Sequence, residues 1–186
     1  MLRPARETDV ENLLAWRNQE VNRQVSTHQA PITAEEHATW WHAVQEDPAR
    51  RVLVLEVDNS PCGVVTFFNL RSDGGRRRGA WGFYLDHDGL AARGATLVAW
   101  QVAVREALDH AFDVLDLDVL EAEVLEHNEV VRRANRRLGF VEGPVQVRRV
   151  AGARAGRTVV RRVVPVELAR EDRRAGPRRA TTGGAA

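Results

Sequence analysis

The sequence contains no lysine, so every basic side chain other than histidine is an arginine. We attribute this bias to a GC-rich coding sequence and give it no functional weight. Cysteine is nearly absent as well. A lone Cys62 in an apolar run excludes a disulfide framework and a cysteine metal cluster, and it predicts a buried thiol in a reducing compartment.

An excess of either charge is also missing, because 27 basic residues stand against 26 acidic ones. No global field therefore favours nucleic acid or a membrane as a partner. The first residues lack the apolar core of a signal peptide, and no run of about eighteen apolar residues occurs. We expect a cytoplasmic protein without a metal site. Its oligomeric state, monomer or homodimer, is left open.

A chain of 186 residues suits one domain with a sizeable core. We assign residues 1–170 to that domain. Residues 171–186 are rich in arginine and poor in apolar side chains, which predicts a disordered tail. An arm that binds nucleic acid or phosphate is the alternative for this segment.

Two N-terminal helices are predicted from the same start signal. Thr8 with Glu11, and Thr33 with Glu36, have the spacing of a capping box. The first helix should end near residue 18 and the second before residue 48, with an irregular loop or a short helix at residues 19–31.

Apolar runs bounded by turn residues predict the strands. They fall at residues 2–6, 52–57, 62–68, 80–85 and 119–125, with a terminal hairpin of residues 145–150 and 158–166 around a turn at 152–156. Residues 71–79 are predicted as a loop. A helical crossover separates the strands at 80–85 and 119–125, so these two should be parallel. The expected fold class is α/β (α+β), with a mixed, mostly antiparallel sheet flanked by helices.

Residues 80–111 are predicted to form a strand, a tight turn and a helix. The rest of the chain is arranged around this stretch. The helix presents an apolar face at the usual spacing, beginning with Leu97 and Trp100. Small residues directly precede it, so an anion could approach the free amides at its start. This is a plausible seat for a pyrophosphate. Further on, Asn128 should cap a short helix that Gly139 ends.

This order of elements resembles the GNAT acyltransferase superfamily over nearly the whole chain up to about residue 168. Residues 82–85 resemble its central strand, 92–95 its pyrophosphate loop, and 121–128 with 137–140 its next strand and helix. The resemblance implies an N-acetyltransferase that uses acetyl-CoA, with the pantetheine arm between two splayed strands. The implied cofactor-binding residues are Phe83, Tyr84, Leu85, Ala92, Arg93, Gly94, Ala95 and Asn128. Asn128 could equally be a plain helix cap.

Within the superfamily, residues 16–18 and 31–37 with Trp41 resemble the branch that acetylates the 4-amino group of nucleotide-linked deoxyaminosugars. This implies a small-molecule amine substrate bound by Arg17, Asn18, His37 and Trp41. A protein N-terminus, a polyamine or an antibiotic amine is the alternative acceptor. A non-catalytic module that binds acyl-CoA is the alternative from another class.

Two departures from the family pattern bear on these implications. The phosphate loop has Gly89, Ala92 and Gly94 at its marker positions, so two of three side chains differ from the family. Backbone amides, rather than these side chains, bind the phosphates, so the substitutions do not exclude acetyl-CoA binding. Asn135 stands where many members have a tyrosine that protonates the leaving thiolate, and an asparagine supplies no proton.

The implied reaction needs a base to take a proton from the attacking ammonium group. Glu123 and Glu126 near the end of one strand, and His37 and His42 on the second helix, are the candidates, and we rank Glu123 and His37 first. Glu123 could instead point to solvent, and His37 could be a packed helix residue. Tyr84, the only tyrosine, is the candidate for an acceptor or proton-donor contact, with a core position as its alternative.

Overall fold

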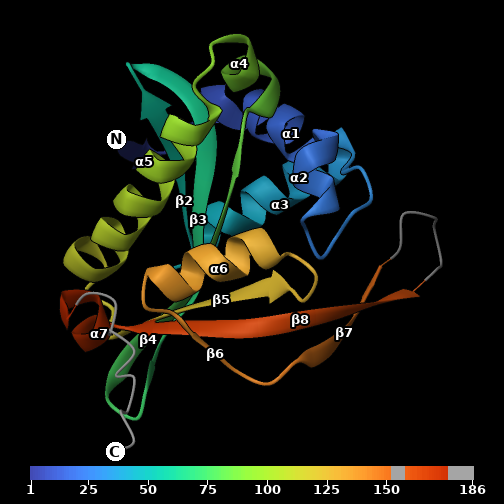
Figure 1. Ribbon diagram of the computed structural model, residues 1–186. Coiled ribbons are helices and arrows are strands. Elements are labelled where there is room, and N and C mark those ends of the chain that lie inside the picture. The colour runs from blue at the N-terminus through green and yellow to red at the C-terminus, as the bar shows by residue number, and fades with distance from the viewer. Residues whose placement is uncertain (152–157, 176–186) are drawn as a thin grey trace, which may run out of the picture.

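A single sheet of eight strands forms the centre of the computed structural model, which describes residues 1–151 and 158–175 (Figure 1). Its strand order is β1-β2-β3-β4-β5-β8-β6, and β7 pairs with β8. Among the described strands, only β4 and β5 pair in parallel. The strands are β1 (Leu2–Pro4), β2 (Arg51–Val57), β3 (Ser60–Asp73), β4 (Arg76–Leu85), β5 (Val119–Leu125), β6 (Val141–Glu142), β7 (Gln146–Ala151) and β8 (Thr158–Ala169).

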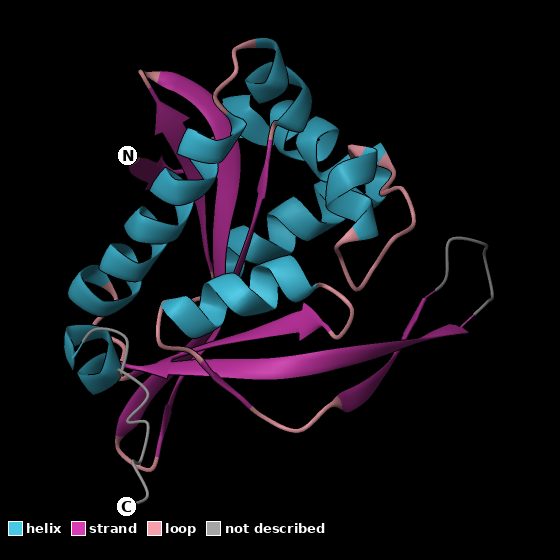
Figure 2. Cartoon of the chain, viewed as in Figure 1, coloured by secondary structure: helices cyan, strands magenta, loops and turns pink. Residues whose placement is uncertain are grey.

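Helices cover both faces of this sheet (Figure 2). They are the turn η1 (Glu7–Asp9), α1 (Val10–Asn18), α2 (Glu20–Gln24), α3 (Ala34–Glu46), α4 (His87–Ala92), α5 (Thr96–Asp109), the π-helical turn η2 (His110–Val114), α6 (Glu129–Arg137) and α7 (Arg170–Ala175). None of these helices has the length and apolar character needed to span a membrane. The expected mixed, mostly antiparallel α/β fold is confirmed.

Alternation along the strands divides the core between the two faces. On one face, Leu13 and Trp16 of α1 and Trp41 of α3 pack against Val54 and Val64. On the other, α5 and the turn η2 bury their apolar side chains against Phe67, Leu120 and Val164 of the sheet, and α6 adds Val131 and Leu138 at the edge. The sheet therefore separates an α1–α3 face from an α5–α6 face.

The two predicted capping boxes had different outcomes. Thr33 caps α3 as expected: its hydroxyl accepts from the Glu36 amide at 3.1 Å, and the Glu36 carboxylate accepts from the Thr33 amide at 2.8 Å. The box at Thr8 is wrong. The Asp9 carboxylate instead accepts from the Arg6 amide at 2.8 Å, because two hydrogen bonds from Arg3 hold it at the start of the helical turn.

The predicted loop at residues 71–79 is also wrong, because β3 and β4 continue as a hairpin to Asp73 and Arg76. Gly74 and Gly75 make the turn with φ of +56° and +79°, which suits glycine at both central positions of a tight hairpin turn. The sequence does not indicate these strands, because this part of the hairpin is rich in charged residues and lacks the alternation of apolar and polar residues that predicts a strand.

Three further expectations are corrected. The turn before α5 contains the helix α4, and Leu97 is 69% exposed because it lies in the first turn of α5 on the solvent side. The disordered tail is wrong for its first five residues, which belong to α7, where Arg173 forms an ion pair with Asp109. The terminal hairpin is confirmed in β7 and β8, whereas its turn at 152–156 and residues 176–186 lie outside the described residues.

The parallel pair β4 and β5 is joined over only three residues, Arg78–Ala80 with Val119–Glu121. Beyond them β4 stays with β3 as far as Leu85, and β5 stays with β8 as far as Leu125. The two strands diverge from this short contact in Figure 1. The sheet is therefore opened between β4 and β5, as the splay expected from the sequence requires.

Replacement of Leu120 by alanine tests whether the root of this opening is a packed part of the core. Leu120 is fully buried in β5 next to the last paired residues, so Leu120→Ala should lower the free energy of unfolding by about 2–5 kcal/mol. Urea denaturation measures this loss. The matched control is Val130→Ala on α6, where the side chain is 72% exposed, and its stability should stay within about 0.5 kcal/mol of the parent.

Candidate active site

A cavity of about 810 Å³ lies at the opening between β4 and β5. Its walls come from both diverging strands, from the loop after α2, and from β3, β6 and β8. The residues lining it are Arg17, Val25, Ser26, Thr27, Phe68, Asn69, Ala80, Trp81, Gly82, Phe83, Glu121, Ala122, Glu123, Leu125, Val141, Glu142, Gly143, Pro165, Val166 and Glu167. Its size suits a ligand of small-molecule dimensions.

Among the described residues that line this cavity, Arg17 is the one cation. It lies at the end of α1, and its Nη2 donates to the His28 carbonyl at 2.9 Å. Its Nη1 is buried and has no hydrogen-bond partner among the described residues. Burial lowers the pKa of Arg17, but the guanidinium stays charged at neutral pH. The cavity thus contains a positive charge with an unused donor.

Each of the four glutamates that line the cavity is already paired with arginine. Glu121 accepts from Arg71 at 3.0 Å and from Arg78 at 2.8 Å, while Arg78 also pairs with Glu167 at 2.7 Å. Burial tends to raise the pKa of Glu121, but the hydrogen bonds from the two arginines outweigh it and keep that pKa below its usual range. Glu121 therefore remains ionised and is a poor proton acceptor.

Glu123 lies two residues further along β5, on the same face as Glu121. Arg148 of β7 pairs with one of its carboxylate oxygens, Oε1, and the side chain is 37% exposed. The second oxygen, Oε2, has no bond from the described residues. Glu123 is thus held at the cavity wall with one oxygen open to a ligand or a water molecule.

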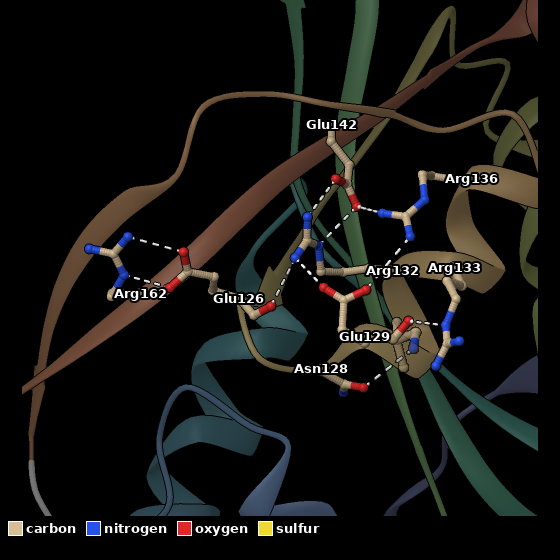
Figure 3. Close-up of polar contacts among 9 residues, drawn as sticks. Glu126, Asn128, Glu129, Arg132, Arg133, Arg136, Glu142 and Arg162 are labelled. Carbon is tan, nitrogen blue, oxygen red and sulfur yellow. Dashed lines mark hydrogen bonds and ion pairs between the residues drawn. The ribbon is translucent and has the colours of Figure 1, made fainter.

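Figure 3 shows how the fourth glutamate, Glu142, is fixed to α6. Arg132 donates to both of its oxygens at 3.0 and 2.7 Å, and Arg136 donates to it at 2.8 Å. Glu126 forms a separate pair with Arg162 outside the cavity lining, which removes it as a base candidate. Asn128 caps α6 as predicted, accepting from the Val131 amide at 3.3 Å.

Tyr84 lies on the same face of β4 as Gly82 and directly follows Phe83, the last β4 residue that lines the cavity. It is close enough to Arg17 for the two side chains to interact electrostatically. Burial raises the pKa of its hydroxyl, and the Arg17 cation offsets only part of that effect. Tyr84 is therefore a neutral hydrogen-bond donor at neutral pH. Phe83 points to the other face, where it stacks on Trp81 and contacts Trp100.

The edge of β4 facing the opening is free of β5 from Trp81 onward. Such an edge offers backbone donors and acceptors to an extended, amide-containing ligand. At its far end, the Leu85 carbonyl accepts from Asn22 at 2.8 Å, and Asn22 is itself buried. The usable part of the edge therefore ends before the Leu85 carbonyl.

The segment after α4 differs in detail from the predicted phosphate loop. The amides of Arg93, Gly94 and Ala95 bond to carbonyls of α4, and Ala92 closes that helix. The amides without a helical partner are the first three of α5, at residues 96–98, one turn further on. Gly94 has φ of +63°, whereas the chain at Ala92 is helical, so alanine there is unstrained. The exposed start of this 14-residue helix fits a pyrophosphate.

Asn18, His37 and Trp41 do not line the cavity. Asn18 binds both backbone groups of Ile32, and Trp41 donates to Glu7 at 2.6 Å from within the core. His37 is only 3% exposed and its ring packs against Trp40 in a tilted arrangement, so it is a packed residue of α3. Of the predicted site residues, Arg17, Tyr84 and Glu123 therefore lie at or next to the cavity. Asn18, His37 and Trp41 lie away from it.

Sequence reasoning missed Arg148 and Glu167 at this site. Both belong to the terminal hairpin, which lies beside β5 only because β8 is inserted between β5 and β6. The sequence shows the hairpin but not its neighbour. No local signal would have placed these side chains at the opening.

Comparisons with known proteins agree with this geometry. A search of the curated proteins finds no significant match. Among solved structures, a spermidine N-acetyltransferase from Vibrio cholerae in complex with CoA and spermine superposes with a TM-score of 0.71 at 18% identity, covering 93% of this chain and 96% of that one. The Campylobacter jejuni N-acetyltransferase PseH gives a TM-score of 0.59 at 15% identity, covering 91% and 97%. A ribosomal-protein-alanine N-acetyltransferase from Brucella melitensis gives 0.58 at 20%, covering 91% and 99%.

These superpositions show that the chain shares its fold with these acetyltransferases. Residues 1–141 match the family described as the acetyltransferase (GNAT) domain. The chain belongs to this family and is an acetyl-CoA-dependent N-acetyltransferase. The structural neighbours differ in the acceptors that their names state, so the family does not fix the amine.

The burial of His37 makes stability depend on pH. Burial lowers its pKa, so below about pH 6.5 the unfolded state binds more protons than the folded state, and stability falls as the pH drops. His37→Leu should reduce the slope of unfolding free energy between pH 7.5 and 5.5 by at most about 1.4 kcal/mol per pH unit. Denaturant unfolding across this range measures the slope.

The matched control is His42→Gln, which removes a histidine from the exposed side of the same helix and leaves the core unchanged. Burial also lowers the pKa values of the half-buried His87 and His110, so some slope remains in every variant. An identical slope in the parent and His37→Leu would contradict the prediction.

Proposed function

We propose that the acceptor is the primary amine of an anionic small molecule, a nucleotide-linked deoxyaminosugar. The observation behind this proposal is the charge pattern of the cavity. Its four glutamates are each paired with arginine, whereas Arg17 has a buried donor without a partner. A phosphate-bearing acceptor supplies the acceptor oxygens that such a guanidinium lacks.

A polyamine is the second candidate, because one structural neighbour is described with spermine bound. A polycation requires carboxylates that are free to pair with it. Here those carboxylates are neutralised from within the chain, and Arg17 would repel a second cation at the cavity wall. The charge pattern therefore favours the anionic acceptor.

In the proposed reaction, acetyl-CoA supplies the activated acetyl group. The start of α5 would hold its pyrophosphate and the open edge of β4 its amide-containing arm, with Asn128 near the latter. A β4 amide on this edge, near Phe83, would donate to the oxygen on which negative charge develops. Arg17 and Tyr84 would orient the acceptor, and Glu123 would take the ammonium proton on its open oxygen, directly or through water.

Asn135 is buried in α6 and offers no proton to the leaving thiolate. We assign that proton to water, because Tyr84 lies on the acceptor face of β4, away from α6. His37 has no part in this mechanism, since it does not reach the cavity.

The test of the acceptor is release of thiol from acetyl-CoA with a panel of amines. The panel holds nucleotide-linked 3-amino- and 4-amino-deoxysugars, the corresponding free sugars, spermidine and an N-terminal peptide. Turnover only with the nucleotide-linked sugars supports the proposal. Turnover only with spermidine or the peptide overturns it, and cofactor binding without any turnover would indicate a non-catalytic module.

Replacement of Glu123 tests the base. Glu123→Gln should lower kcat by about 10²-fold or more and remove the acidic limb of the pH profile of kcat/KM, because the rate then no longer depends on its ionisation. Glu126→Gln is the matched control, a strand-end glutamate that is also paired with arginine but lies outside the cavity lining. An unchanged pH profile in Glu123→Gln would remove this residue from the mechanism.

A further inference from the structure

The loop between α2 and α3, residues 25–33, closes one side of the cavity and contains no acidic residue. Its first residues line the cavity, and its middle is held by arginine side chains from three separate elements. Arg17 donates to the His28 carbonyl at 2.9 Å, Arg23 donates to the Gln29 carbonyl at 3.3 Å, and Arg161 of β8 donates to the Gln29 side chain. None of these three arginines forms an ion pair within the described residues.

Arg161 resembles Arg17 in a second respect. Its Nε is buried and has no hydrogen-bond partner among the residues that the structure describes. Burying a cationic group without a partner is costly, so two such donors beside the same loop need an explanation. The arginines on the other sides of the cavity differ, because Arg71, Arg78 and Arg148 each contact a carboxylate.

The position of Arg161 in the sheet adds to this cost. Arg161 lies directly opposite Arg148 in the β7–β8 register, and like charges at opposed positions destabilise a sheet. Glu123 neutralises Arg148 but leaves Arg161 without a counter-charge. An anion on this side of the hairpin would relieve the repulsion.

Arg161 is connected to two parts of the cavity lining. Its strand neighbour Arg148 holds Glu123 of the lining, and its own guanidinium holds the loop that contributes Val25, Ser26 and Thr27. Arg17 of the lining holds the same loop at the His28 carbonyl. The two donors without a partner in the described residues thus belong to arginines that contact one loop of the cavity wall.

We propose that Arg161 and Arg17 together bind the diphosphate of the acceptor, with residues 25–33 ordered between them. This inference rests on the proposed function and names the groups that recognise the phosphates. Arginine is suited to the task because its donors match phosphate oxygens in pairs. Release of the Gln29 side chain from Arg161 would free a further donor for the ligand.

The test uses inorganic pyrophosphate as a probe of the full chain with its cofactor site saturated by CoA. Calorimetric titration should show binding to the parent protein, and Arg161→Gln should weaken it by about 10- to 100-fold. The matched control is Arg149→Gln, which removes an exposed arginine of the same hairpin whose side chain forms no hydrogen bond or ion pair within the described residues. It should change the affinity by less than about threefold.

In kinetics, Arg161→Gln should raise KM for a nucleotide-linked aminosugar by a similar factor with little change in kcat, because Arg161 does not touch the reacting atoms. KM for the free aminosugar should not change. Equal losses in Arg161→Gln and Arg149→Gln, or pyrophosphate that competes only with CoA, would overturn the inference. Arg161→Lys keeps the charge without the planar group, so it provides the comparison if Arg161→Gln unfolds.

The two proposals fail in different ways. If the enzyme acetylates nucleotide-linked sugars and Arg161→Gln keeps the parent KM, the anion site is wrong and the proposed function stands. If no such sugar is acetylated but pyrophosphate binds the parent and not Arg161→Gln, the anion site is supported and the acceptor is wrong.

Discussion

The interruption of pairing between β4 and β5 is the constraint on which the rest of the site depends. Each strand keeps its outer partner, β3 or β8, while the two share only three residue pairs with one another. The gap leaves β4 with an open backbone edge and β5 with carboxylates facing a cavity. A sheet paired throughout would have neither an edge for an extended arm nor room for an acceptor beside it. In the proposed reaction, both substrates would bind at this one interruption in the hydrogen-bond ladder.

The charged side chains around this opening fall into two groups: glutamates that form ion pairs with arginines, and arginines that form no ion pair within the described residues. Carboxylates at the cavity are matched by arginines from β3, β4, β7 and α6, so the opening has little free negative charge despite its four glutamates. Three arginines that form no ion pair within the described residues, Arg17, Arg23 and Arg161, hold the loop after α2. Glu123, the proposed proton acceptor, therefore lies on one wall of the cavity, and the arginines that form no ion pair within the described residues hold the loop on another side.

The terminal hairpin connects these two walls. Arg148 and Arg161 lie opposite each other in its register and contact Glu123 and Gln29, respectively. The hairpin therefore holds both the proposed base and the loop beside the acceptor, although it is far from either in the sequence. Arg148 and Arg161 therefore connect the hairpin to different parts of the cavity, and a variant of either one needs a control within the same hairpin.

Local patterns in the sequence determined the order of elements, the cap at Thr33, the helix start at Asn128 and the end at Gly139, because each depends on neighbours within one turn of chain. They also pointed to Arg17, Tyr84 and Glu123. The sequence could not show that β3 and β4 extend through residues 71–79, since a charged arm lacks an apolar alternation, nor that His37 and Trp41 turn into the core. Only the tertiary structure placed β8 beside β5, and with it Arg148 and Arg161, because contacts between strands distant in the chain leave no local periodicity.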